Sequence, residues 1–559
     1  MLHHITNREK LIVMLAVMSG LFLVALDQTI IATALGAIVT EFDSFSSIGF
    51  IVTAYLLTST VTVPLAGKLS DMYGRRVILI SGVILFTLAS LLSGIAPNVE
   101  ALIAARALQG IGGGMIMANA FTIIGDLFSP RERGKWQGLI GAVFGVSSVI
   151  GPLLGGFLTD SHTILGLTTN WRWTFLINIP IGIIATFVIA RYCPAIKHDS
   201  EHTPDYLGAA FITVALASLV LSVDNTDVIF KALIDQGNAV GLIKAILMAI
   251  AVTAGIAFVM IEKRAKQPII SLDFFKNRTF TLMVSAMLLF GAAFLGAILY
   301  LTQFNQQVFG ASASEAGLML LPMVGGLMLA SIGTGQIVSR VGKYKRFILI
   351  GFGLAATGML SLITLTPDSP YWHEAIIMAF TGFGLGMGMP ILNLAVQNEF
   401  EQKDLGSATA SVQLFRGLGS TIGTALMSGI LTAGILSAVG APGDVPYIQT
   451  LKKSPESAKM LGSEISADTL LQINSQKDTI RASAEQSFSA IPSEKLQQKA
   501  RADFTRQQDD FSRLIVDAFT AALHHIFLVS SVLMVIAFII VSFVKEKPLR
   551  SGMSTTPGE

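Results

Sequence analysis

Gly67-Lys68-Leu69-Ser70-Asp71-Met72-Tyr73-Gly74-Arg75-Arg76 lies between two long apolar runs of the sequence. Charge this dense is costly inside a bilayer, so the stretch is expected at the boundary between membrane and water. We interpret it as a tight cytoplasmic turn that joins two transmembrane helices, and we call it the first hinge.

The composition of the whole chain agrees with this interpretation. Of its 559 residues, 52% are hydrophobic and only 13% are charged, whereas a soluble protein of this size needs more charge to cover its surface. The net charge of +2 gives no reason to expect nucleic-acid binding, and the single cysteine, Cys193, excludes an intrachain disulfide. The sequence has no cleavable signal pattern, no GxxxxGK(S/T) nucleotide loop and no metal-ligand cluster. We therefore expect no cofactor, no enzyme activity, and an ion gradient as the energy source.

Apolar runs of membrane-spanning length recur about fourteen times. They lie near 11–35, 48–66, 77–96, 101–127, 135–159, 174–192, 206–223, 240–261, 279–302, 316–338, 346–366, 373–397, 406–436 and 519–544. The chain is therefore expected to be an all-α polytopic membrane protein.

Cations gather in the short loops on one side of these spans, whereas the opposite loops, such as Asp368/Glu374, are poor in Lys and Arg. The positive-inside rule then predicts that both termini are cytoplasmic. We expect a multi-pass protein of the plasma membrane. On this topology the polar residues 437–518 form a long external loop before the last span. Its stretch 494–517 has a helical composition that can continue into that span. A poorly ordered insertion and a folded lid over the outer mouth are both open interpretations of this loop.

The first hinge has a counterpart 268 residues later, in Gly335-Gln-Ile-Val-Ser339-Arg-Val-Gly342, where the glycines keep their seven-residue spacing. Other glycine patterns repeat at an offset of 272: Gly110-Ile-Gly112-Gly-Gly114 matches Gly382-Phe-Gly384-Leu-Gly386, Gly134 matches Gly406, and 145–151 matches 417–423. Four matches in one order predict two homologous halves.

The repeat pairs spans 3, 4 and 5 with spans 11, 12 and 13, so each half has six helices and spans 7 and 8 are an insertion. The predicted domains are a first half (1–197), two inserted helices (198–270) and a second half (271–559) that contains the external loop. Two parallel repeats are typical of transporters that rock one half against the other around a central site.

Several stretches resemble the major facilitator superfamily, in particular its fourteen-helix drug:proton antiporter branch. The first hinge resembles the signature between spans 2 and 3, Leu102–Gly110 resembles the span 4 signature, and Leu26–Leu35 and Asn170–Pro180 resemble motifs of this branch. The pattern in span 5 resembles the antiporter signature of the family, and its residues are Gly145, Gly151, Pro152, Gly155 and Gly156. Met72 stands where the family usually has a basic residue, and Gly36 where it usually has proline.

Asp27 is the only carboxylate deep within the spans of the first half, and Arg106 lies at a similar depth in span 4. Intramembrane charges are expensive and normally face a partner or a wet cavity. Their repeat counterparts are Leu295 and Met378, so the glycine scaffold repeats but the charges do not. We predict that Asp27 takes and releases the proton beside Arg106; the alternative is a static pair that only joins spans 1 and 4.

For the first hinge, the resemblance implies a conformational gate between the halves, made of Gly67, Asp71, Gly74, Arg75 and Arg76. Asp71 can sit at the positive N-terminus of a helix of the other half, and the repeat nominates span 13 near Gly406 and Ser407. We predict an Asp71–Ser407 contact that holds the cytoplasmic side shut. A plain charged turn is the alternative, above all for Arg76.

The glycines of span 5 allow close helix packing. The resemblance to the family implies that this packing favours one conformation and prevents protons from leaking between the helices. Arg416 lies near mid-membrane in span 13 and either binds an anionic group of a substrate or belongs to a structural network. The candidate cavity residues are Gln109, Asn393, Gln413 and Arg416, and Gln397 is a further polar neighbour. The spans of the second half show no clear intramembrane carboxylate.

Together these features predict a monomeric antiporter that exports a small hydrophobic, cationic compound in exchange for protons by alternating access. A transporter of the same fold with one dedicated substrate, such as a siderophore, lipid or metabolite, is the first alternative. A membrane sensor or scaffold that uses its external loop is the second.

Overall fold

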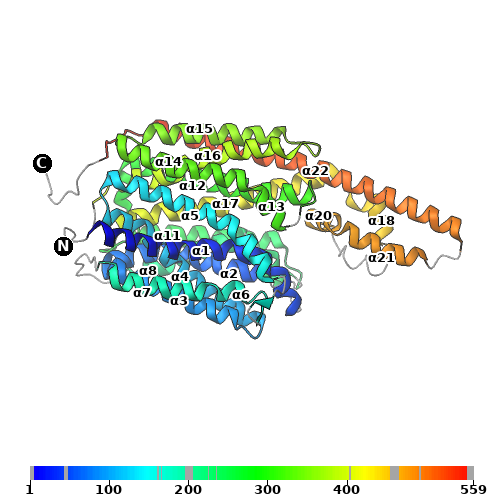
Figure 1. Ribbon diagram of the computed structural model, residues 1–559, viewed down its shortest axis with the longest axis horizontal. Coiled ribbons are helices and arrows are strands. Elements are labelled where there is room, and N and C mark those ends of the chain that lie inside the picture. Colours follow the sequence, from blue (N-terminus) through cyan, green and yellow to red (C-terminus); the bar gives the residue numbers. More distant parts are fainter. Residues whose placement is uncertain are drawn as a thin grey trace.

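The structure is a computed structural model that describes residues 6–42, 48–159, 163–164, 167–194, 205–223, 226–234, 236–311, 313–401, 404–452, 465–489 and 493–549. Within this part of the chain, fourteen helices are long and apolar enough to cross a membrane, which confirms the span count expected from the sequence. They pack side by side into one bundle (Figure 1).

The spans of the first half follow one another through short turns. They are α1 (Asn7–Glu41), α2 (Ile48–Tyr73), α3 (Arg75–Gly94), α4 (Val99–Leu127), α5 (Pro130–Thr159) and the pair α6 (Trp173–Leu176) and α7 (Asn178–Tyr192). A small antiparallel ladder, β1 (Thr163–Ile164) with β2 (Leu167–Thr168), precedes α6. A capping box between Thr6 and Glu9 starts α1, and the Asn98 side chain caps α4, so each of these helices begins at a residue that satisfies its free N–H groups.

The inserted helices lie beside the first half. They are α8 (Tyr206–Val223) and α11 (Val240–Glu262), with α9 (Thr226–Ile229) and α10 (Lys231–Ile234) between them. Apolar side chains of α8 and α11 pack with Val61 of α2 and with Leu414 of the second half. The insertion therefore covers one line of contact between the halves.

The second half repeats the order of the first. Its elements are η3 (Leu272–Lys276), α12 (Arg278–Gln307), α13 (Ala313–Met319), α14 (Leu321–Val341), α15 (Lys345–Ser361), η4 (Leu362–Thr364), α16 (Tyr371–Gln397), α17 (Leu405–Val439) and the end of α22 (Glu494–Ser542). Gly74 and Gly342 occupy equivalent hinges, and both have positive φ angles, 103° and 71°, that glycine adopts without strain.

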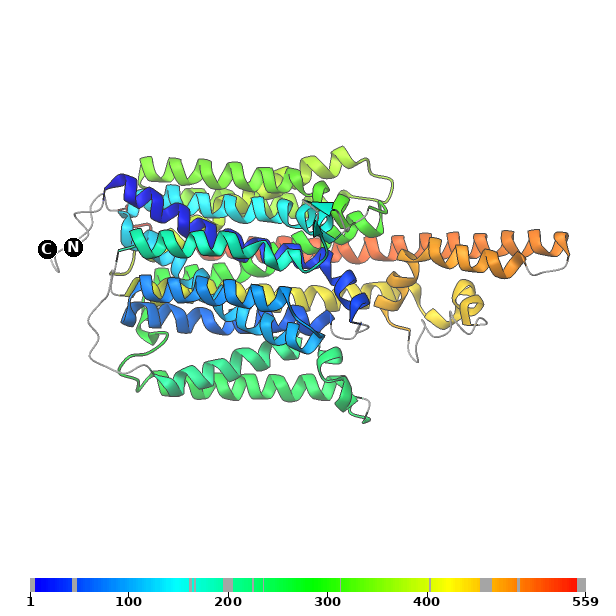
Figure 2. The same cartoon turned by 60° about the horizontal axis from the view of Figure 1, so that its bottom comes forward.

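The loop before the last span is folded in its described residues. It contains η6 (Pro442–Asp444), α18 (Pro446–Lys452), α20 (Ala467–Ser475), α21 (Lys477–Ser489) and the first half of α22, which runs unbroken into the membrane span as the composition predicted. Tyr447 packs between Phe504 and Phe511, and Gln508 donates to the Tyr447 hydroxyl at 2.8 Å. These helices project away from the bundle rather than covering it (Figure 2). Neither interpretation of the loop, an unordered insertion or a lid, describes this arrangement.

The described chain begins and ends at the same end of the bundle, which we call the termini end; the projecting helices mark the opposite, hairpin end (Figures 1 and 2). Leu549 donates its N–H to the Gly342 carbonyl at 2.9 Å, and Lys10 lies 5.5 Å from the centre of the Phe128 ring. The hinges therefore lie at the termini end.

Candidate functional site

Asp27 lies on α1, is fully buried, and is surrounded by donors from two other helices. Arg106 Nη1 on α4 is 2.5 Å from Asp27 Oδ2, and Gln109 Nε2, one turn further along α4, donates to Asp27 Oδ1 at 2.8 Å. Asn178 Nδ2 on α7 is 3.4 Å from the same oxygen. We call these residues the Asp27 cluster.

The polar neighbours of the Asp27 cluster all come from the first half. Ser90 on α3 accepts hydrogen bonds from Gln109 at 2.7 Å and from Asn178 at 3.1 Å. The Arg106 guanidinium lies 4.4 Å from the centre of the Tyr55 ring of α2, a distance that favours a cation–π interaction. The cluster is therefore assembled from residues of one half.

The structure brings Asp27 and Arg106 together, as their depths in the sequence suggested. It places Gln109 differently from the expected cavity position, because Gln109 is fully buried between Asp27 and Ser90. Residues three apart share a helix face, so the spacing of Arg106 and Gln109 was a signal for this placement. Ser90 and Tyr55 carried no comparable signal.

The Asp27 cluster balances a buried negative charge. As an ion, Asp27 is balanced by Arg106 and by two amide donors. These interactions offset the free energy that burial of the charge costs. A proton on Asp27 removes the counter-charge of Arg106, which then keeps its contact with the Tyr55 ring and its bond to Gln109 Oε1 at 2.8 Å. A proton or a cation arriving here thus changes what holds α1 to α4.

The first hinge contacts the other half at the termini end. Ser407 N, in the first turn of α17, donates to Asp71 Oδ2 at 2.9 Å. The Ser407 hydroxyl donates to the Ile269 carbonyl at 2.6 Å, in the segment that follows the inserted helices. The contact nominated by the repeat therefore exists in this structure, and it places a carboxylate at a helix N-terminus, where the helix dipole favours it.

The two arginines of the hinge bind within the first half. Arg75 pairs with Asp71 and, through Nε at 2.9 Å, with Asp126 at the end of α4. Arg76 donates to the Ala190 carbonyl of α7. Asp126 was missed from the sequence, although an acidic residue in the last turn of span 4, on the side of the basic hinge, was a signal for it.

Further bonds join the halves at the termini end. Gln397 at the end of α16 accepts from Gln137 at 2.9 Å and donates to the Phe121 carbonyl at 3.0 Å. Ser331 of α14 donates to the Gly138 carbonyl of α5 at 2.9 Å. Gln397 was expected near Arg416, but the structure places it across the contact between the halves.

Two glycine contacts between the halves are related by the repeat. A Cβ at Gly67 would overlap Ala410 and lie 3.1 Å from the Gly406 carbonyl oxygen, and a Cβ at Gly134 would lie 2.9 Å from the Gly335 carbonyl oxygen. α2 thus meets α17 as α14 meets α5. Asp71 has Ser339 as its counterpart, so the carboxylate of the first contact is replaced by a hydroxyl at the equivalent position of the second.

The glycines of the span 5 signature face two partners. A Cβ at Gly151 or Gly155 would overlap a threonine hydroxyl of α1, whereas a Cβ at Gly145 would lie 2.9 Å from Met328 of α14. Pro152 lies against Gly317 of α13, and Gly156 is half-buried. α5 therefore packs closely against its own half and against the other half at once.

Replacing Gly335 by alanine is expected to lower the stability of the contact between α5 and α14. Its Cβ would meet the backbone of Gly134 and Gly138, which cannot move aside without separating the helices. We expect a loss of about 1–3 kcal/mol, seen as a lower thermal unfolding temperature of the purified protein. Gly333→Ala on the same helix is the matched control, because nothing lies within 4 Å of its Cβ. Equal unfolding temperatures for the two variants would contradict this packing.

Arg416 lies in a polar chain within the second half. Its Nε donates to Gln413 Oε1 at 3.0 Å, and Gln413 donates to Asn393 Oδ1 at 3.2 Å. Gln413 and Asn393 are buried and Arg416 is half-buried. These hydrogen bonds place Arg416 in a polar network; in the described residues no ion pair involves it.

An ion pair between Arg172 and Glu41 lies at the hairpin end of the first half. Arg172 and Trp171, before α6, donate to Glu41 at 2.7 Å and 2.6 Å. Burial raises the pKa of Glu41, but the hydrogen bonds from Arg172 and Trp171 outweigh it and hold the pKa below its usual value. The motif around Asn170–Pro180 therefore ties the end of α1 to the start of span 6.

One expectation about the second half is wrong. Its spans were expected to lack an intramembrane carboxylate, with Glu374 counted among loop residues. The structure places Glu374 in the first turn of α16, fully buried within a membrane-spanning helix. A position so close to a helix start does not distinguish a loop from a span in the sequence.

Residues 17–424 match the family model described as Major Facilitator Superfamily. The chain is 39% identical over 414 residues to "Multidrug transporter protein MdtP" of Bacillus subtilis, covering 74% of each chain. It is 36% identical over 420 residues to "Multidrug resistance protein 3" of the same organism, covering 75% of this chain and 79% of the relative.

Solved structures of low sequence identity share the fold. The proton:xylose symporter XylE matches with a TM-score of 0.57 at 15% identity, over 96% of this chain and 97% of its own. The human organic anion transporter MFSD10 (TETRAN) matches with a TM-score of 0.55 at 16% identity, over 76% of this chain and 94% of its own.

Proposed function

Because this chain belongs to the major facilitator superfamily, a family of transporters and not of enzymes, we propose that it exports hydrophobic, cationic compounds in exchange for protons by alternating access. The names of the two Bacillus subtilis relatives support multidrug efflux as the activity. The observation that carries proton exchange is the buried Asp27, held by Arg106 and Gln109.

In the proposed cycle a proton and a cationic substrate compete for the negative charge of Asp27. A cation in reach of the carboxylate favours release of the proton, and a proton on the carboxylate favours release of the cation. Because the Asp27 cluster joins α1, α3, α4 and α7, either event alters the packing of the first half. That change supplies the differential binding energy that biases the two halves between their arrangements.

The proposed gate is the set of bonds at the termini end. With both termini in the cytoplasm of a plasma-membrane protein, Asp71, Ser407 and Gln397 close the cytoplasmic side. In the proposed cycle, a closed cytoplasmic side is expected of the outward-facing state, which takes a proton and releases substrate. Opening inward requires the Asp71–Ser407 bond to break and the small-residue contacts of α5 and α17 to separate.

Efflux of chemically different cations from proteoliposomes tests the proposal. The purified full chain is reconstituted, and export of ethidium, tetraphenylphosphonium and rhodamine 6G is followed with and without an imposed proton gradient. We expect gradient-dependent export of all three at rates at least about tenfold above protein-free vesicles. Export of a single compound would favour a dedicated exporter, and no proton-dependent flux of any compound would overturn the proposal.

A further inference from the structure

A buried carboxylate in the second half has no part in the function proposed above. Glu374 on α16 and Asn305 on α12 are both fully buried at the hairpin end. When the Asn305 amide is turned with its nitrogen toward Glu374, Nδ2 lies 2.9 Å from both carboxylate oxygens. The two side chains thus form one polar contact between α12 and α16 in apolar surroundings.

No described Lys or Arg forms an ion pair with Glu374. α16 contains no Lys or Arg, and those of α5, α12, α14 and α15 lie at the termini end of each helix. α17 carries Arg416, which lies in the part of that helix nearer the termini end and donates to Gln413. The titratable groups at the hairpin end of the helices packed around Glu374 are Tyr371 and His373 on α16, Tyr300 on α12, Glu315 on α13 and His524 on α22. Tyr371 donates to the Met319 carbonyl at 2.9 Å, and His524 contacts the Leu365 carbonyl at 2.7 Å.

A buried carboxylate without a cation is stable only where its charge can be removed or balanced. Burying an unpaired ion costs several kcal/mol, so protonation is the ordinary solution for such a group. The N-terminus of α16 and the Asn305 amide favour the ionised form to a smaller extent. Glu374 is therefore placed where both protonation states are accessible.

The Asn305 side chain can satisfy either state of Glu374. Its NH₂ group donates to the ionised carboxylate, and its carbonyl oxygen accepts from the protonated acid. Rotation of the amide by half a turn exchanges these two roles without moving a helix. A fixed donor such as Arg106 beside Asp27 does not have this property.

We propose that Glu374 and Asn305 form a second proton-binding site, in the second half, in addition to Asp27 in the first. Proton binding by this pair stands on its own geometry, whereas its part in transport rests on the function proposed above. With one site in each half, the protein exchanges two protons per cycle. Exchange of two protons for one monovalent cation moves one net positive charge across the membrane.

Infrared difference spectroscopy of the full chain in lipid nanodiscs, taken between acid and alkaline pH, tests proton binding directly. We expect a carbonyl band of a buried carboxylic acid that is lost in Glu374→Gln and kept in Glu100→Gln, an exposed glutamate at the same end. In Asn305→Leu the band is kept but its frequency changes, because the acid loses its acceptor. Thermal unfolding of each variant confirms that it is folded. A Glu374→Gln spectrum with the same bands as the wild type would overturn the proposal.

Transport of tetraphenylphosphonium in proteoliposomes tests the role of the second proton. Wild-type efflux is expected to respond to a membrane potential set with valinomycin, whereas one-for-one exchange by Glu374→Gln is expected not to respond. An unchanged response to the potential in Glu374→Gln would exclude this role. If the wild type does not transport the probe, the proposed efflux function fails, while the infrared experiment still decides whether Glu374 binds a proton.

Discussion

Asp27→Asn is expected to reduce proton-driven efflux to the level of protein-free vesicles while the protein still expresses and folds. Asparagine has nearly the size of aspartate, and its single side-chain oxygen can still accept one of the two bonds that Asp27 accepts from Arg106 and Gln109, so the fold keeps most of its contacts. It cannot bind or release a proton, so the step that couples the gradient to the substrate is lost. The measurement is proton release on addition of ethidium to purified protein, together with efflux in proteoliposomes.

Two further variants make the result on Asp27 decisive. Asp27→Glu keeps a carboxylate and is expected to retain partial, shifted activity, which distinguishes a titrating group from a structural one. Glu100→Gln, an exposed carboxylate change on α4, is expected to behave as the wild type. Unchanged efflux in Asp27→Asn would remove Asp27 from the mechanism and favour the static pair with Arg106.

A disulfide between positions 71 and 407 is expected to stop transport completely and reversibly. Asp71→Cys/Ser407→Cys, made with Cys193→Ser, places two thiols at neighbouring positions of the halves, since Asp71 accepts from the Ser407 N–H. Oxidation then locks the termini end, and reduction with dithiothreitol restores opening. Efflux before and after oxidation, with cross-linking followed by gel mobility, measures the effect.

The cross-link needs its own reference pair. Asp71→Cys/Ser411→Cys places the second thiol one turn further along α17 and is expected to cross-link poorly, since disulfide geometry is specific. Each single-cysteine variant controls for loss of the Asp71 carboxylate itself. Failure of 71 and 407 to cross-link in any condition would contradict the gate.

Much of the scaffold follows from glycine positions in the sequence. The repeat of the hinge and of the span 4 and span 5 glycines fixed which helices are equivalent, and from that Ser407 emerged as the partner of Asp71. Small residues are informative because only they allow backbones to approach closely, as Gly67 does at Gly406. The domain boundaries at 197 and 270 remain predictions.

The polar residues were harder to place than the glycines. Gln109 was expected in a cavity because the sequence indicates its depth in the membrane but not the direction of its side chain. Its spacing from Arg106 supplies that direction. Glu374 was taken for a loop residue because it lies in the first turn of its helix. The helix at 494–517 was predicted, but the packing of the described residues of the external loop was not, because its apolar contacts, such as Tyr447 with Phe504, join segments far apart in the sequence.

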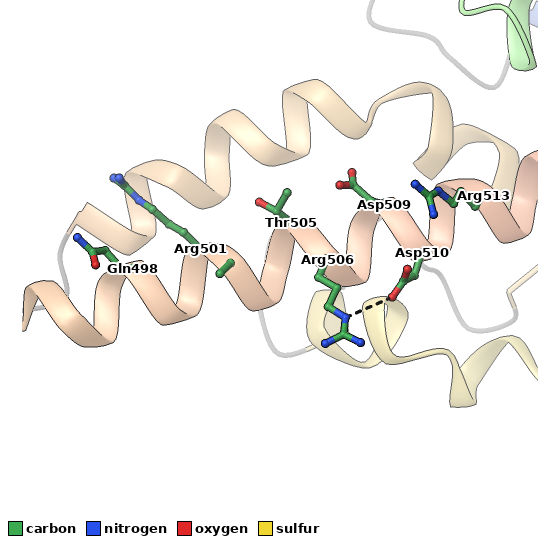
Figure 3. A pocket seen from close by; sticks show the side chains of 8 residues that line it. Gln498, Arg501, Thr505, Arg506, Asp509, Asp510 and Arg513 are labelled. Carbon is green, nitrogen blue, oxygen red and sulfur yellow. Dashed lines mark ion pairs between the residues drawn. The ribbon is translucent and has the colours of Figure 1, made fainter.

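The outer surface of the projecting helices shows why a visible hollow is not always a site. Figure 3 shows one on α22, lined by Gln498, Arg501, Ala502, Thr505, Arg506, Asp509, Asp510 and Arg513. Its Arg506–Asp510 contact is 3.9 Å long, and both side chains are mostly exposed to solvent. Ion pairs between solvent-exposed charges contribute little free energy, so we assign no binding role to this hollow.

The length of α22 has a mechanical consequence. The helix has 49 residues and thus measures about 74 Å, and its span packs against α12, α15 and α17 of the second half. A rigid rod fixed to a rotating body amplifies the rotation at its free end. Each tilt of the second half should therefore sweep the start of α22, near Glu494, through an arc far wider than any displacement inside the membrane. Single-molecule recordings of a fluorophore placed there would report each change in the orientation of the second half.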